Sequence, residues 1–244
     1  MQSGFFTSAS FLIIFAVERK PELYAIVIIL YTILLVQAFH DGFYDRKPDT
    51  TSTVFSGPCL GEETVVSRDP QVLLRADKVI LPGVGSFGEA MENLHKYGLV
   101  PVIQDMIKKG TPFLGICLGL QLLFESSEET PGVEGLGILK GKILRIPPSP
   151  GLKIQHMGWN SLHLQNNGRL FKDIPEDTHV YFVHSYYLQA EDPQIVKAVT
   201  EYSTTIHASV EKDNVFACQF HPEKRSKYGL KIHENFAKLE KEGN

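Results

Sequence analysis

The stretch Thr111-Pro-Phe-Leu-Gly-Ile-Cys-Leu-Gly-Leu-Gln-Leu-Leu-Phe-Glu125 runs from a predicted strand into a predicted helix with no loop between them. Cys117 stands at the junction with a glycine two residues away on each side, as a sharp strand-to-helix turn requires. Such a turn lifts its central side chain above the carboxyl end of a sheet, where open α/β sheets bind ligands. The start of the helix favours the thiolate, and the backbone N–H of Leu118 points to where an oxyanion would form. We therefore interpret Cys117 as a nucleophile; a small cysteine buried at a strand end is the alternative.

A cysteine nucleophile needs a base and a group that orients the base. His221 follows a predicted strand at 215–220, and Glu223 stands two residues later. Side chains two residues apart in an extended segment point the same way, so this imidazole and this carboxylate can form a hydrogen bond. Alone, a His-Pro-Glu sequence is more often a surface turn, but the elbow at Cys117 favours a catalytic pair.

A second glycine-rich strand end is Pro82-Gly-Val-Gly85, which follows a predicted strand at 78–81. It is either a simple tight turn or a place where the backbone approaches a substrate and donates an N–H to an oxyanion. It is not a phosphate-binding P-loop, because a Lys followed by Ser or Thr is absent. No spacing of Cys and His suits a metal site, so we expect no bound metal ion.

Short apolar strands alternate with helices from about residue 60, which predicts parallel β-α-β units. The strands of this part are predicted at 63–66, 78–81 and 111–116, and the helices at 89–94, 100–109 and 118–125. Further strands are predicted at 141–146, 179–183, 196–199, 206–210 and 215–220, before a helix at 229–241. The order predicts one α/β domain over residues 60–244, with a mostly parallel central sheet flanked by helices and a more antiparallel second half.

The composition narrows the class of protein. With 24 Lys plus Arg against 28 Asp plus Glu, the formal net charge is -4, which provides no electrostatic footprint for nucleic acid. The hydrophobic content of 43% and the charged content of 21% are those of an ordinary globular protein. The 3 cysteines are too few for a disulfide scaffold, which favours a reduced, cytoplasmic compartment.

Residues 1–59 differ from the rest, because the first 40 positions are mostly apolar. The apolar run at 11–17 is too short to cross a membrane, and the run at 23–39 lies at the lower limit of about 17 residues for a spanning helix. We favour a buried strand at 24–30 followed by a helix; a membrane segment and an altered reading frame are the alternatives. Residues 45–59 are rich in Thr, Ser, Pro and Gly and predict a loop or linker.

Five motifs resemble those of the class I (triad) glutamine amidotransferases, which have a flavodoxin-like α/β fold. Within that family, the resemblance is greatest to the glutaminase subunits of imidazole glycerol phosphate synthases, and it extends from about Leu60 to the C-terminus. The motifs are Leu81-Pro-Gly-Val-Gly-Ser-Phe-Gly88, Gly115-Ile-Cys-Leu-Gly-Leu-Gln-Leu-Leu-Phe124, His156-Met-Gly-Trp-Asn160, Tyr181-Phe-Val-His-Ser-Tyr186 and His221-Pro-Glu-Lys224.

The resemblance implies that Cys117 attacks the side-chain amide of L-glutamine, with His221 as the base and Glu223 as its orienting partner. Ammonia is released, water hydrolyses the glutamyl thioester, and no cofactor takes part. In the family, the ammonia passes to a (β/α)8-barrel cyclase that makes imidazole glycerol phosphate and an aminoimidazole carboxamide ribonucleotide in histidine biosynthesis. A barrel of about 250 residues does not fit in this chain beside the glutaminase, so the expected partner is a separate cyclase subunit. The implied substrate-binding residues are Gly83, Val84, Gly85, Leu118, Gln121, Ser185 and Tyr186. The implied residues near the cyclase interface are Trp159, Tyr181 and Lys224.

The chain departs from the family pattern in two places. Arg225 follows His-Pro-Glu-Lys where the family usually has Ser, and no Gly-x-Gly-Asn turn occurs before Leu60, so residues 1–59 are atypical.

Two other functions stay open. One is the glutaminase of another pathway, such as that of pyridoxal phosphate or purines, against which the His156–Asn160 motif counts. The other is a non-catalytic, membrane-tethered binding module.

Overall fold

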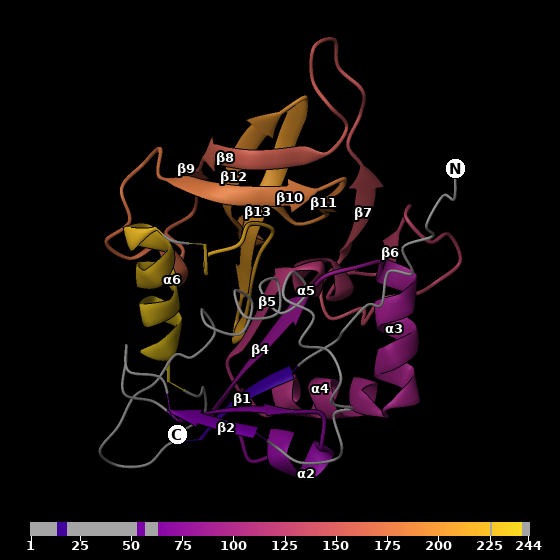
Figure 1. Cartoon of the computed structure of the whole chain (residues 1–244), viewed down its shortest axis with the longest axis vertical. Helices are drawn as coiled ribbons and strands as arrows, with labels where there is room; N and C mark the ends of the chain where they lie inside the picture. Colours follow the sequence, from indigo (N-terminus) through magenta and orange to yellow (C-terminus); the bar gives the residue numbers. More distant parts are fainter. Residues whose placement is uncertain (1–13, 19–52, 57–62, 225, 241–244) are drawn as a thin grey trace, which may run out of the picture.

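A computed structural model describes residues 14–18, 53–56, 63–224 and 226–240, and it has an α/β fold built on a mixed central sheet (Figure 1). The order of the strands in this sheet is β2-β3-β1-β4-β5-β14-β13-β12-β9. Their bounds are β1 (Ile14–Glu18), β2 (Thr53–Ser56), β3 (Glu63–Ser67), β4 (Lys78–Gly83), β5 (Phe113–Cys117), β9 (His163–Leu164), β12 (Val196–Tyr202), β13 (Thr204–Lys212) and β14 (Val215–Cys218).

Parallel pairing is confined to the centre of this sheet, where β5 lies between β4 and β14. The remaining ladders of the sheet are antiparallel. The predicted α/β class and the antiparallel second half are therefore confirmed, but parallel pairing covers less of the sheet than the sequence predicts. The parallel register places Gly83 beside Cys117, so the two glycine-rich strand ends lie next to each other.

Helices cover both faces of the parallel centre, which explains its near-continuous apolar strands. Leu81 and Phe113 pack in the core on the face covered by α3 (Phe87–Lys96), α4 (Leu99–Lys108) and α5 (Leu118–Leu122). Ile80 and Leu114 pack in the core on the opposite face, with Phe236 of α6 (Lys227–Ala237). Figure 1 shows α6 on one side of the sheet and α3 and α4 on the other. A short α2 (Pro70–Leu73) precedes β4.

Two smaller sheets lie beyond the carboxyl ends of the central strands. One pairs β8 (His156–Ser161) with β10 (His179–His184), and the other has the order β11-β7-β6, with β6 (Ser126–Ser127), β7 (Gly141–Arg145) and β11 (Tyr186–Ala190). Two 3-10 turns complete the described elements, η1 (Arg169–Phe171) and η2 (Pro193–Ile195). The sequence analysis predicts neither β8 nor β11, because the mixed polar and aromatic residues of β8 show no alternation and each strand depends on a distant partner.

The N-terminal expectations are only partly testable. The segment Thr53–Ser56 forms β2, so the prediction of a loop over 45–59 is wrong there; its ladder with β3 outweighs the turn-rich composition. Strand β1 lies in the apolar run at 11–17, for which the sequence analysis predicts no strand. The strand expected at 24–30 and the helix after it lie outside the described residues. Within the described part of the chain, no helix has both the length and the apolar character needed to span a membrane.

Candidate active site

The predicted strand–turn–helix at Cys117 is present in the structure. Cys117 ends β5, has a φ of 55° and a ψ of -110°, and is followed at once by α5. A positive φ is uncommon for a residue other than glycine, and such strain clusters at functional sites. The glycines are required by close approach: a Cβ on Gly119 would lie 1.8 Å from the Leu81 carbonyl oxygen, and one on Gly115 would lie 2.6 Å from the Gly119 carbonyl oxygen. The thiol is therefore held in place by backbone packed against backbone.

His221 and Glu223 form the hydrogen bond that their spacing predicts. His221 Nδ1 lies 2.6 Å from Glu223 Oε1, and both side chains are buried. The carboxylate only accepts, so Nδ1 carries a proton and Nε2 is the atom that can exchange one with a neighbour. Among the residues the structure describes, no hydrogen-bond partner occupies Nε2. The loop that carries the histidine is fixed by its backbone N–H, which donates to the Tyr181 carbonyl oxygen at 2.9 Å.

Electrostatics favour a charged histidine beside the thiol. Burial by itself lowers the pKa of His221, but the neighbouring Cys117 and the Glu223 carboxylate together raise that pKa to about 10. Burial acts to raise the pKa of Glu223, and the hydrogen bond and charge of His221 outweigh it and lower that pKa. An imidazolium held this way stabilises a thiolate and can later protonate a leaving amine.

Cys218 is a second cysteine near this site. It lies at the end of the neighbouring strand β14, fully buried, with its thiol 3.5 Å from the Phe220 carbonyl oxygen. Burial, with smaller contributions from the charges of Glu223 and Cys117, raises its pKa well above the usual range. Cys218 therefore stays a neutral thiol, which leaves Cys117 as the candidate nucleophile.

Several of the residues predicted to bind substrate lie at or next to the elbow. Gly83 ends β4 beside Cys117, Val84 is exposed, and Gly85 has a φ of 106°. From α5, Gln121 donates its side-chain N–H to the Tyr186 carbonyl oxygen at 3.0 Å. Two more predicted positions are Leu118, the first residue of α5, and Ser185, which lies between β10 and β11 with its carbonyl oxygen accepting the Ile146 N–H at 3.0 Å.

Gln219 belongs to this site although the sequence analysis does not single it out. It is fully buried, its Oε1 accepts from Gln121 Nε2 at 3.0 Å, and its Nε2 lies 3.7 Å from Cys117 Sγ. Two signals point to it. It is the polar residue at the end of an otherwise apolar strand, and it precedes His221 by two positions, which places both side chains on one side of an extended segment.

Comparison with known proteins identifies the family. A model described as glutamine amidotransferase class-I matches residues 62–239. The chain is 52% identical over 71% of its length to the imidazole glycerol phosphate synthase subunit HisH of Aquifex aeolicus, covering 83% of that protein. This chain belongs to the class-I glutamine amidotransferases. It is also 47% identical to the HisH subunit of Methanocaldococcus jannaschii, over 81% of this chain and 98% of that protein.

Solved structures agree on the fold of this class-I glutamine amidotransferase. A crystal structure of a glutamine amidotransferase superposes with a TM-score of 0.54 at 19% identity, covering 70% of this chain and 82% of that one. A putative GMP synthase component from Thermoplasma acidophilum gives a TM-score of 0.50 at 20% identity, over 69% and 75% of the two chains. At such low identities the likeness concerns the fold alone.

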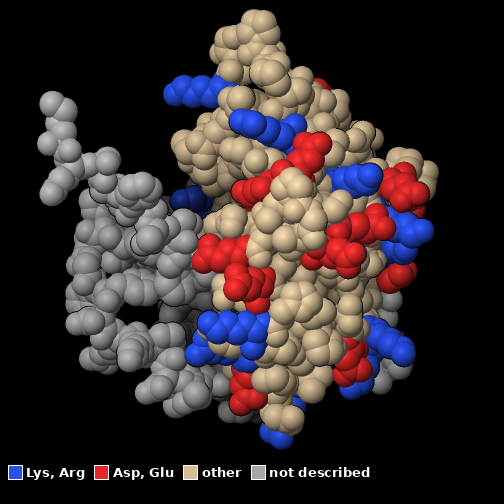
Figure 2. All heavy atoms as spheres, turned by 90° about the vertical axis from the view of Figure 1, so that its right-hand side faces the viewer, with Lys and Arg blue, Asp and Glu red and all other residues tan. Residues whose placement is uncertain are grey.

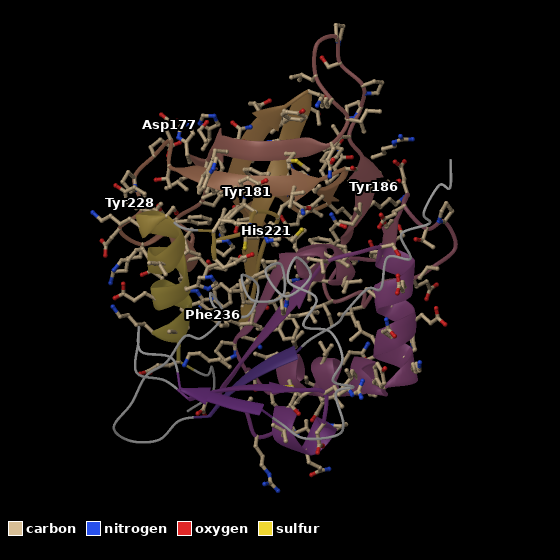
Figure 3. The ribbon with its side chains drawn as sticks, in the orientation of Figure 1. Asp177, Tyr181, Tyr186, His221, Tyr228 and Phe236 are labelled. Carbon is tan, nitrogen blue, oxygen red and sulfur yellow. The ribbon has the colours of Figure 1, made fainter. Side chains whose placement is uncertain are left out.

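The three residues predicted near a partner interface lie together beside His221 in this amidotransferase. The register of β8 and β10 pairs Trp159 with Tyr181, and their ring centroids are 5.7 Å apart in an edge-to-face arrangement. The Lys224 ammonium lies 5.4 Å from the centre of the Tyr181 ring. Figure 3 shows Tyr181 directly above His221. Arg225, the departure from the family pattern, lies outside the described residues.

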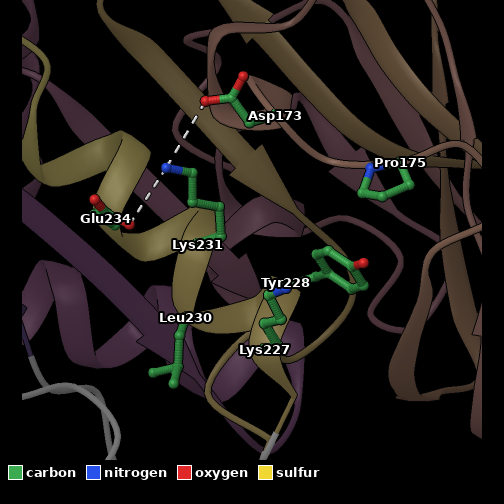
Figure 4. A pocket seen from close by; sticks show the side chains of 7 residues that line it. All are labelled: Asp173, Pro175, Lys227, Tyr228, Leu230, Lys231 and Glu234. Carbon is green, nitrogen blue, oxygen red and sulfur yellow. Dashed lines mark ion pairs between the residues drawn. The ribbon is translucent and has the colours of Figure 1, made fainter.

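Two other features of the amidotransferase lie apart from the elbow. A pocket of about 500 Å³ opens between α6 and the 173–175 segment, and Lys231 spans it with ion pairs to Asp173 at 3.8 Å and Glu234 at 3.4 Å (Figure 4). No predicted site residue lines this pocket. The group His163, Glu176 and Asp177 has ligand-type atoms within 4.8 Å of one another, although the sequence predicts no metal site. These side chains are largely exposed, and His163 Nδ1 lies 3.6 Å from Glu176 Oε1 and 3.2 Å from Asp177 Oδ1, contacts that account for the grouping.

Proposed function

We propose that this chain is the glutaminase subunit of an imidazole glycerol phosphate synthase. It hydrolyses L-glutamine to glutamate and ammonia and passes the ammonia to a separate cyclase subunit. The observation that carries the chemistry is the buried His221–Glu223 pair, with the His221 pKa raised to about 10 by Cys117 and Glu223. The relatives named HisH, about half identical over most of this chain, support the choice of synthase.

The reaction begins when the Cys117 thiolate attacks the side-chain amide carbon of glutamine and forms a tetrahedral oxyanion. The backbone N–H of Leu118 and the Gly83–Gly85 segment face this oxyanion, since β4 ends beside the elbow. As the C–N bond breaks, His221 gives its Nε2 proton to the amine, which leaves as ammonia, and a glutamyl thioester remains.

Hydrolysis of the thioester returns the site to its starting state. Neutral His221 takes a proton from water through Nε2, and the hydroxide attacks the thioester carbonyl. The second tetrahedral intermediate collapses and expels the Cys117 thiolate, which releases glutamate. The new carboxyl group then loses its proton to solvent. Glu223 keeps Nδ1 protonated in both halves of the cycle, so the same histidine nitrogen acts first as acid and then as base.

The partner docks on the group formed by Trp159, Tyr181 and Lys224, which lies next to His221. Half of the Trp159 surface is exposed, and large aromatic side chains together with charged ones are typical of protein interfaces. Figure 2 shows that positive and negative side chains are interspersed on the face in view, which gives no support to nucleic-acid binding there. We assign the complex to the cytoplasm, as befits cysteines that are not paired in a disulfide among the described residues.

The test is a glutamate-release assay of the full chain with and without the cyclase subunit. Wild type should turn over glutamine with the cyclase present, and Cys117→Ala should lose turnover entirely. Cys218→Ala is the matched control: it removes a neighbouring thiol that stays protonated, and activity should persist. Absence of glutamine turnover in the complex, or persistence of turnover in Cys117→Ala, would disprove the proposal.

A further inference from the structure

A continuous series of hydrogen bonds runs from the thiol to the edge of the small β8–β10 sheet. Near the thiol it consists of Gln219 Nε2 to Cys117 Sγ, 3.7 Å, and Gln121 Nε2 to Gln219 Oε1, 3.0 Å. The same Gln121 nitrogen donates to the Tyr186 carbonyl oxygen at 3.0 Å. That oxygen is also within 2.9 Å of His184 Nδ1, so one carbonyl joins the glutamine site to a buried histidine.

The series continues through a second buried histidine into β8. His184 Nε2 lies 3.0 Å from His156 Nδ1, and His156 Nε2 lies 3.3 Å from Asn160 Nδ2. The His156 ring is held between two aromatic rings, that of Phe182 at 4.5 Å and that of Tyr202 at 4.1 Å, both nearly parallel to it. Because this stacking prevents the ring from turning away, a displacement of β8 moves His156 with it.

The direction of each hydrogen bond between Tyr186 and Asn160 follows from the Tyr186 carbonyl oxygen, which can only accept. A carbonyl oxygen has no proton, so His184 Nδ1 must donate to Tyr186. His184 is neutral, because burial lowers its pKa to about 3, so its Nε2 is a lone pair that needs a donor. His156 Nδ1 supplies that proton, and its own Nε2 accepts from the Asn160 amide. Burial also lowers the pKa of His156, to about 4, so the arrangement is not disturbed by protonation near neutral pH.

We propose that His156, His184 and Gln219 are positioning residues through which strand β8 sets the orientation of the Gln121 amide and of the N–H donor to Cys117. The inference rests on the proposed function, because β8 carries the docking residue Trp159. Met157, which directly follows His156 in the chain, is exposed, as is Trp159. Both residues belong to β8, the strand that holds His156. A partner bound there acts on the thiol without touching it, by holding β8 and with it the Tyr186 carbonyl.

The two ends of the series have different expected effects. Gln219→Met removes the amide donor to Cys117 while keeping a chain of similar length. The loss of this hydrogen bond should lower kcat about 10- to 100-fold without the cyclase and leave little response to the cyclase, because the amide is the last link to the thiol. His156→Phe keeps the stacked ring but removes the donor to His184. We expect the cyclase to increase turnover in the wild type; His156→Phe should raise the KM for glutamine and abolish most of that increase.

The experiment measures kcat and KM for glutamine in the wild-type chain and its variants, alone and with the cyclase subunit. His156→Asn places an amide N–H where Nδ1 was, so it should restore most of the cyclase effect. His207→Phe is the control, since it removes a histidine that accepts a hydrogen bond elsewhere, from the Ala190 N–H at 3.1 Å. Thermal unfolding of each variant separates lost positioning from lost folding.

A double-mutant cycle decides whether the series acts as one unit. The double variant His156→Phe with Gln219→Met should lose little more kcat/KM than Gln219→Met alone, because residues in one network have non-additive effects. Fully multiplicative losses, or a His156→Phe variant that responds to the cyclase as His207→Phe does, would overturn the inference and leave the proposed function intact. If the wild-type complex does not turn over glutamine, the proposed function itself fails.

Discussion

Glu223→Gln is the most informative single substitution in this site, because it keeps the shape of the side chain and removes its charge. The pair it alters is almost dry: the side chains of His221 and Glu223 are 7% and 2% exposed, and their atoms are 2.6 Å apart. Removing one partner of a buried ion pair costs about 3–5 kcal/mol. If that whole loss fell on the transition state, kcat/KM would drop by about a hundredfold to a few thousandfold. Since glutamine can still accept a hydrogen bond from Nδ1, we expect the lower end, about a hundredfold.

The pH dependence of kcat/KM and of Tm also tests the role of the Glu223 charge, because each should shift in a definite direction when this charge is removed. The charged pair is intact below the pKa of His221, which Cys117 and Glu223 raise to about 10 against the effect of burial. Without the Glu223 charge that pKa falls, so the alkaline limb of the kcat/KM profile should move to lower pH. For stability, a pKa raised from 6.5 to about 10 on folding contributes fully below pH 6.5, and this contribution is lost as the pH rises to about 10. The Tm should therefore decline over that interval more in the wild type than in Glu223→Gln.

The assay is glutamate release by the cyclase complex from pH 6 to 10.5, with thermal unfolding of the chain measured at the same pH values. Glu211→Gln is the control, because Glu211 accepts from Arg169 Nε at 2.7 Å in an ion pair outside the site, in which Arg169 is exposed and Glu211 is mostly covered. The control should keep the wild-type profile. A Glu223→Gln enzyme within threefold of wild type, with its alkaline limb unmoved, would refute the role we give to the carboxylate.

Three further outcomes follow from the packing and the surface. Gly119→Ala should lower stability by more than about 3 kcal/mol in denaturant unfolding, because its Cβ would lie 1.8 Å from a backbone oxygen, whereas Gly98→Ala, with open space and a φ of 65°, should cost about 1 kcal/mol. Asn214→Ala should cost about 2 kcal/mol in the same measurement, since Asn214 Nδ2 donates to two carbonyl oxygens at 2.8 and 2.9 Å. Trp159→Ala should weaken binding of the cyclase about 30-fold in calorimetry, as expected for an aromatic residue at the centre of an interface; unchanged affinity would move the interface elsewhere.

The local geometry of the nucleophile could be predicted from the sequence because steric exclusion acts between near neighbours. Gly115 and Gly119 flank Cys117, and the structure shows a backbone oxygen where each side chain would be. The His221–Glu223 hydrogen bond, which the two-residue spacing predicts, is present, but the segment forms a turn, closed by the Lys224 N–H donating to the His221 carbonyl oxygen at 3.2 Å, and not the extended segment that the prediction assumes. Strands β8 and β11 could not be predicted, because their residues become strands only through pairing with β10 and β7, which are distant in sequence.

The pairing register of the central strands explains why the role of Gln219 is harder to predict from the sequence than that of the residues around it. The parallel ladder pairs Ile116 with Cys218, so the next residues, Cys117 and Gln219, leave their strands side by side. On the other edge of β5, the ladder pairs Cys117 with Gly83. A one-residue shift of the ladder between β5 and β14 would leave every local motif unchanged and would turn the Gln219 amide away from the thiol, and the same shift between β4 and β5 would move Gly83 away from Cys117. The motifs thus indicate which chemistry the chain carries, whereas the register of β4, β5 and β14 decides which side chains come together in the site. The position of the Gln219 amide beside Cys117 depends on that register alone.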